Sequence, residues 1–240
     1  DILQLTLFWQ AQEQIGARYK VFVHVVDGRG NIVGQRDGEP VGDLRPTTTW
    51  QPDEIIADNY GILLPPGTPP GGHTVRVGLY GLEDGRRLPV QRASEALGDA
   101  LTLVRVAIQP PLAPPPLSAL DLQRSDASSW GALRLVGHSL HRLGFEHEAK
   151  LTLRPGDVAK LVLFWQKGAG APAQEEFIVA LQDRKGKNLW EHKLQVTGGT
   201  FPLALWREGE VVRDIQLLFL PPALPPGAYR LVLRADGWAQ

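Results

Sequence analysis

The segment Gly137-His138-Ser139-Leu140-His141 carries residue types from which a serine hydrolase could be built. Its first residues match the G-x-S-x-G turn that presents the nucleophilic serine of α/β-hydrolases. That turn needs a second glycine, because strand and helix must pack closely around the serine, and His141 stands there instead. No helical pattern follows. We therefore predict an ordinary strand, and a serine hydrolase acting through Ser139 is kept as an alternative.

Three nearby histidines, His138, His141 and His147, suggest a metal site, since imidazole nitrogens commonly bind zinc. Residues three apart on a strand point to opposite faces, so His138 and His141 are not expected to converge on one ion. The chain also lacks the H-E-x-x-H pattern of helical zinc sites. We expect neither a metal nor another cofactor.

Acidic side chains gather between residues 37 and 58, where their carboxylates could hold calcium or cleave a glycoside. They are Asp37, Glu39, Asp43, Asp53, Glu54 and Asp58. Their spacing does not match a calcium-binding EF-hand loop. A structural role in hydrogen bonds is the favoured interpretation, with calcium binding as the alternative.

An internal repeat sets the organisation of the chain. Leu7-Phe8-Trp9-Gln10 recurs 156 residues later as Leu163-Phe164-Trp165-Gln166. The same offset relates Asp27 to Asp183, Gly30 to Gly186, Trp50 to Trp206, Glu54 to Glu210 and Asp58 to Asp214. A constant offset over so many positions predicts two copies of one module. The aspartate shared at positions 58 and 214 is expected to be a structural anchor, bonded to backbone amides or to an arginine.

Tryptophan gives the most interesting functional hypothesis, because exposed indole rings form flat platforms for sugars. Trp9 and Trp165 lie on alternating strands and are expected to face a core. Trp130, Trp190 and Trp238 have no aromatic counterpart in the other copy. We predict a ligand surface that uses these three side chains together with Asp37, Glu39 and Asp43.

Alternating apolar residues predict strands in both copies. The expected strands are 3–10, 19–26, 32–36, 54–64, 73–80 and 100–108, then 133–140, 150–153, 160–166, 176–182, 188–193, 211–220 and 228–234. Helical turns are expected only within 92–99 and 117–129. The pattern predicts an all-β chain of two tandem immunoglobulin-like antiparallel β-sandwiches. The expected domains are 1–110 and 118–240, joined by a proline-rich linker at 111–117.

Composition excludes several classes of function. There are no cysteines, so disulfides, thiolate nucleophiles and cysteine-bound zinc are ruled out. The formal net charge of −1 offers little attraction for nucleic acid. No apolar run is long enough to span a membrane. Because the chain has no methionine and starts within a strand pattern, we expect it to be part of a longer protein.

The repeat also predicts unpaired strand edges. Residues 133–153 have no counterpart in the first copy, and residues 86–108 have none in the second. Each module is therefore expected to lack a strand. We predict that another segment of the chain, or a neighbouring molecule, replaces it.

The assembled motifs are LFWQ, a valine-rich strand, D-G-x-G, W-x-P-x-E, L-P-P with P-P-G, V-x-V-G-L-Y-G and R-L-P-V. They occupy residues 7–10, 21–26, 27–30, 50–54, 64–71, 75–81 and 87–90. This set resembles the carboxyl-terminal β-sandwich regions of bacterial membrane glycosyltransferases of the mannosyltransferase type. The resemblance implies a location outside the cytoplasm. It also implies that the membrane-spanning segments and the catalytic residues belong to a part of the parent protein that is absent from this sequence. The second copy departs from the pattern at residues 234–237.

The sequence thus predicts no enzyme. It favours a non-catalytic accessory region that binds or positions a glycan or a protein partner. A purely structural spacer is the second hypothesis.

Overall fold

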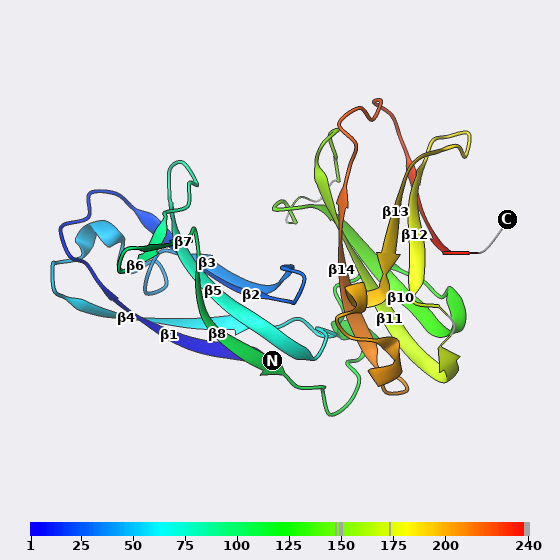
Figure 1. The fold of residues 1–240 in the computed structure, drawn as a ribbon, viewed down its shortest axis with the longest axis horizontal. Helices are drawn as coiled ribbons and strands as arrows, with labels where there is room; N and C mark the ends of the chain where they lie inside the picture. Colours follow the sequence, from blue (N-terminus) through cyan, green and yellow to red (C-terminus); the bar gives the residue numbers. More distant parts are fainter. Residues whose placement is uncertain (147, 149–150, 173, 238–240) are drawn as a thin grey trace. The chain divides into compact units, whose positions relative to one another are not determined.

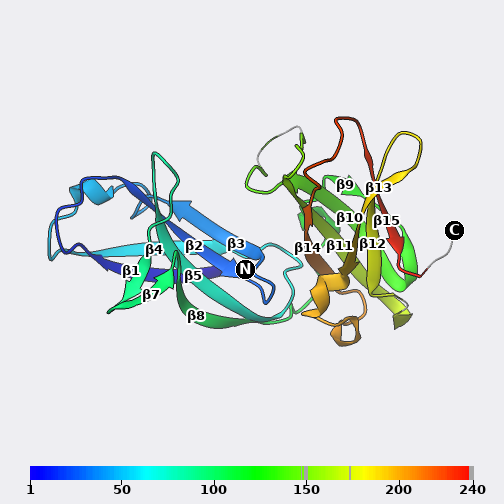
Figure 2. The same ribbon diagram turned by 45° about the horizontal axis from the view of Figure 1, so that its top comes forward.

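The computed structural model describes residues 1–146, 148, 151–172 and 174–237. It confirms an all-β chain built from antiparallel sheets (Figures 1 and 2). The chain divides into two compact units. The first consists of Asp1–Pro65 and Gly71–Gln109, and the second of Pro66–Pro70 and Pro110–Gln240.

The first unit has two main sheets. One pairs β1 (Ile2–Gln10) with β4 (Ile55–Leu63). The other has the order β3 (Ile32–Gly38), β2 (Tyr19–Val26), β5 (Gly71–Gly81) and β8 (Leu101–Ile108). A hairpin of β6 (Val90–Arg92) and β7 (Glu95–Gly98) replaces the helical turn expected within 92–99. Ala93, with φ at 52°, lies in the turn between these two strands, a conformation that a helix cannot contain.

The second unit also has two sheets. The first has the order β14 (Val211–Phe219), β11 (Val158–Pro172), β10 (Ser129–Arg142) and β9 (Arg124–Ser125). The second has the order β13 (Asn188–Gln195), β12 (Glu176–Gln182) and β15 (Arg230–Ala235).

Short 3-10 turns complete the described chain. They are η1 (Thr47–Thr49), η2 (Leu117–Ala119), η3 (Val196–Gly199) and η4 (Leu203–Leu205). Residues 151–153 form no strand, so the strand predicted at 150–153 is wrong over that part. Within 117–129 the only helical structure among the described residues is η2, which follows a run of prolines that cannot continue a helix.

Strand pairing repeats at the offset found in the sequence. Leu7 pairs with Asp58 between β1 and β4, and Leu163 pairs with Asp214 between β11 and β14. The β2–β3 ladder shifts register between Val25 and Val26, and the β12–β13 ladder shifts at the equivalent Leu181 and Gln182. The hydrogen bonds that Asp27 accepts in the turn after β2 match those that Asp183 accepts in the turn after β12. The two units therefore share backbone hydrogen-bonding as well as residues.

The cores of the two units differ around the shared tryptophan. In the second unit, Trp165 is fully buried and lies 5.0 Å from the ring of Phe177. In the first unit, Trp9 is half-buried and packs against a cluster that contains Trp50 and Ile56. The predicted inward orientation is observed for both, but only the second unit encloses its tryptophan. Strand β10 lies beside β11, whereas β1 pairs only with β4 within the described residues.

The aspartates at the repeat position are buried hydrogen-bond acceptors. Asp58 Oδ2 accepts hydrogen bonds from Trp9 Nε1 and the Tyr60 hydroxyl, and its Oδ1 accepts one from the Val41 amide at 2.8 Å. Asp214 accepts bonds from Trp165 Nε1 at 3.3 Å and from Gln216 Nε2 at 2.8 Å. Both carboxylates thus hold their tryptophans across a strand pair.

Candidate functional site

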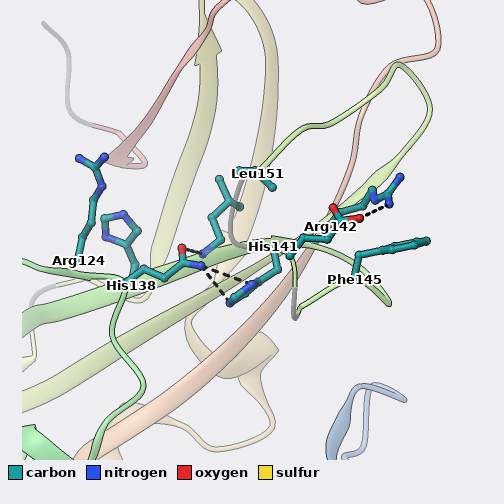
Figure 3. Close-up of a pocket in the computed structure, with 9 residues that line it drawn as sticks. Arg124, His138, His141, Arg142, Phe145 and Leu151 are labelled. Carbon is teal, nitrogen blue, oxygen red and sulfur yellow. Dashed lines mark hydrogen bonds and ion pairs between the residues drawn. The ribbon is translucent and has the colours of Figure 1, made fainter.

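A hollow of about 460 Å³ opens on the second unit beside strand β10 (Figure 3). It is within the size range of small-ligand sites. Polar, cationic and apolar side chains share its lining: Gln123, Arg124, His138, Leu140, His141, Arg142, Phe145, Glu148 and Leu151. In Figure 3, Arg124 and His138 lie at one end, and Arg142 and Phe145 lie at the other.

The hollow forms where the short strand β9 stops pairing with β10. The ladder between them contains only Gly137 with Ser125 and His138 with Arg124. Beyond it, the Gln123 side chain takes the place of a strand backbone, because its Oε1 accepts a hydrogen bond from the Leu140 amide at 2.9 Å. Its Nε2 lies 3.4 Å from the ring nitrogens of His141. Gln123 therefore both ends the ladder and positions the imidazole.

His138 is a half-buried titratable group of the hollow. Burial lowers the pKa of its imidazole, with Arg124 acting in the same direction and the carboxylate of Asp126 opposing it. At neutral pH the ring is therefore mainly uncharged. An anion entering the hollow would favour the protonated form, so the site would take up a proton as it binds an anion.

Arg142 forms the other end of the hollow. Its Nη2 donates a hydrogen bond to Glu148 Oε1 at 3.0 Å, and its guanidinium carbon lies 3.4 Å from the centroid of the Phe145 ring. Its Nε is buried and has no hydrogen-bond partner within the described residues. Stacking on an aromatic ring and pairing with a carboxylate hold the side chain in place. Phe145 and Leu151 are about two-fifths exposed and add an apolar rim.

Gly137 allows the two walls of the hollow to approach closely. A Cβ at this position would lie 2.5 Å from the carbonyl oxygen of Arg124. Gly137→Ala should therefore push β9 away from β10 and lower the free energy of unfolding by about 1 to 3 kcal/mol. Chemical denaturation followed by circular dichroism measures this change.

Gly168→Ala on the neighbouring strand β11 is the matched control. Its Cβ would meet its nearest neighbour, the carbonyl oxygen of Ala132, at 3.5 Å, an ordinary contact. We expect little change for this variant. Equal stability of the two variants would show that the close approach at Gly137 is not needed.

The residues of the alternative serine hydrolase lie within strand β10, where the sequence predicted an ordinary strand. Ser139 is buried in β10 opposite Val162, and it does not line the hollow. His138 and His141 both line it, although they were expected on opposite faces, because the hollow runs along the edge of β10. His147 lies outside the described residues. No group of three acidic, histidine or cysteine side chains in the described chain is placed to hold a metal ion.

The tryptophans of the predicted ligand surface do not meet in one place. Trp130 is half-buried and packs edge-on against Trp165 and Phe177, at 6.0 and 5.0 Å between ring centroids. Trp190 is half-buried, packs on the same core and stacks with His192 at 5.7 Å. Trp238 lies outside the described residues. Trp130 and Trp190 thus contribute to packing.

The acidic side chains of the predicted surface bond to neighbours in the first unit. Glu39 is buried and accepts a hydrogen bond from Arg18 Nε at 2.9 Å. Asp43 accepts a bond from the Glu39 amide at 2.8 Å, and Asp37 lies 3.3 Å from His24 Nε2. These contacts fit the structural interpretation of the acidic stretch.

Sequence reasoning considered His138 and His141 as metal ligands, rejected that role, and missed their neighbours in the hollow. Gln123, Arg124 and Arg142 are isolated polar residues that belong to no motif. Arg124 reaches the site through a strand of two residues, which alternation cannot reveal. These residues come together only in the folded chain, and no sequence pattern links them.

Comparisons with models of protein families, with curated proteins and with solved structures gave no match. Among the described residues, no helix has the length and apolar character needed to cross a membrane.

Proposed function

We propose that this protein is a non-catalytic binding module that holds an acidic glycan in the hollow of its second unit. The observation that carries the proposal is the convergence of Arg124, His138 and His141 on one ligand-sized hollow with an apolar rim. An arginine can bind a sugar carboxylate through two parallel hydrogen bonds. Imidazole and amide groups can bond hydroxyls, and Phe145 can pack against the apolar face of a sugar ring.

The same lining gives no support to catalysis. Among the described residues that line the hollow, Glu148 is the one carboxylate, and it is paired with Arg142. General acid–base cleavage of a glycoside needs two carboxyl groups placed on either side of the bond. A nucleophilic serine must reach its substrate, and Ser139 is buried.

Isothermal titration calorimetry with a uronic-acid oligosaccharide tests the proposal. We expect saturable binding, with affinity about tenfold to a hundredfold lower for the neutral sugar of the same linkage, because the charged hydrogen bonds are lost. Arg124→Ala should weaken binding of the acidic sugar to the same degree. Binding should also tighten as the pH falls from 7 to 5, because the bound anion raises the lowered pKa of His138 while the sugar carboxylate stays ionised.

The control is Arg134→Ala, which removes an exposed arginine from the neighbouring strand β10, outside the hollow. This variant should bind like the unmodified protein. Absence of binding, or equal loss in both arginine variants, would contradict the proposal.

A structural spacer is the second candidate, favoured by the internal pairing of the acidic side chains and the packing of Trp130 and Trp190. We further infer that the two units are tandem immunoglobulin-like sandwiches, supported by ladders that repeat at one offset. The resemblance of residues 5–90 supports an accessory region of a membrane glycosyltransferase, outside the cytoplasm. Labelling of intact cells with an amine reagent that cannot cross membranes tests that location, and an unlabelled region would oppose it.

A further inference from the structure

The free edge of β1 differs from the edges that folded proteins usually expose. From Ile2 to Gln10 the strand contains no charged residue, no proline and no glycine. Natural edge strands usually carry such residues, because an unpaired backbone edge can otherwise recruit another strand. β1 has nine residues, pairs with β4 on one side and has no strand on its other side within the described chain.

The equivalent strand of the second unit has neighbouring strands along both edges, and its apolar side chains are buried. β11 lies between β14 and β10, and its Leu161, Leu163 and Trp165 are buried. At the same repeat positions in β1, Leu5 and Leu7 are only half-buried. The side chains of β1 are thus those of a central strand placed at an edge.

We propose that the free edge of β1 pairs antiparallel with the β1 edge of a second copy of this chain. The proposal is independent of glycan binding, since it concerns the first unit. A two-fold axis at Thr6 would pair all nine residues of the strand with those of its partner. Odd-numbered positions would then meet odd-numbered positions, so Leu3 would lie opposite Trp9 and Leu5 opposite Leu7.

In this register each face of the sheet continues across the axis, with Gln4 opposite Phe8 and Ile2 opposite Gln10 on the outer face. The inner face would join apolar side chains only, which continues the alternation of β1 across the axis. On the outer face Thr6 would lie opposite its own copy, and threonine pairs are favourable across strands. Backbone groups that now face solvent would gain ladder partners.

Sedimentation velocity of the whole chain tests the proposal. We expect a concentration-dependent dimer. Thr6→Lys, which would place two ammonium groups opposite each other at the axis, should raise the dissociation constant by about tenfold or more. A mixture of Thr6→Lys and Thr6→Glu chains should restore the dimer at low salt, because the two charges would then attract.

Asn59→Lys is the matched control. Thr6 Oγ1 bonds to Asn59 Oδ1 at 2.7 Å, and both residues are exposed on the same face, but Asn59 lies on β4, away from the free edge. This variant should dimerise like the unmodified chain.

A monomer at all accessible concentrations would overturn the proposal, as would a dimer that tolerates Thr6→Lys. A further arm adds a synthetic peptide of residues 129–142, the sequence of β10. If the chain is monomeric and that peptide protects the β1 amides from hydrogen exchange, the edge accepts a different strand, and self-pairing is wrong.

Discussion

Trp165→Ala should lower the free energy of unfolding of the second unit by about 3 to 5 kcal/mol, the cost of removing a fully buried aromatic side chain. Trp165 is completely enclosed and contacts the rings of Trp130 and Phe177. Its removal would leave a cavity and also take a hydrogen-bond donor from Asp214. Native-state hydrogen exchange read by mass spectrometry measures the loss on strands β11 and β12 separately from the first unit.

The repeat supplies a matched comparison for this prediction. Trp9→Ala removes the same side chain at the same repeat position, where it is only half-buried. We expect a smaller loss, about 1 to 2 kcal/mol, confined to the first unit. Trp165→Phe keeps an aromatic ring but loses the five-membered ring with its N–H group, and its loss should fall between the two. Equal losses for the two alanine variants would contradict the difference in burial.

Asp214→Ala should destabilise the second unit by about 2 to 4 kcal/mol, because two buried donors would lose their shared acceptor. The donors are Trp165 Nε1 and Gln216 Nε2. This loss should clearly exceed the loss from removing a surface ion pair, since exposed pairs contribute about 0 to 1 kcal/mol.

Asp58→Ala is the equivalent change in the first unit, where three groups donate to the carboxylate. Burial and the bond to Asp58 raise the pKa of the Tyr60 hydroxyl, which therefore stays a donor. A comparable loss is expected there. Lys193→Ala, which removes an exposed partner of Asp236, is the surface control. If either aspartate variant lost no more stability than this control, the anchor role would be wrong.

Much of the fold follows from the alternation of apolar residues. Strands β2 and β12 were predicted with the bounds that the structure has, because both faces of each are apolar and turn residues flank them. The β6–β7 hairpin was missed because its short strands are largely exposed and carry no apolar alternation. The two-residue strand β9 lacks any local signal, since its position depends on the neighbouring β10.

The candidate site was less predictable than the fold. Its histidines can be picked out as candidate site residues from the sequence alone. The contact of Gln123 with His141 cannot, because it joins segments that only the folded sheet brings together. The tryptophans are the opposite case, because a side chain that stands out in the sequence packs against the core. Trp130 has no counterpart in the first copy, yet it completes the core around Trp165, because β10 itself has no counterpart there.

A histidine-resolved NMR titration tests the central claim, that the hollow beside β10 is the ligand site. Addition of a uronic-acid oligosaccharide should shift the imidazole signals of His138 and His141 and raise the pKa of His138. His24, His73 and His192 do not line the hollow and should keep their positions. Unchanged signals for His138 and His141 at saturating ligand, or equal shifts for these two and for His24, His73 and His192, would contradict the account.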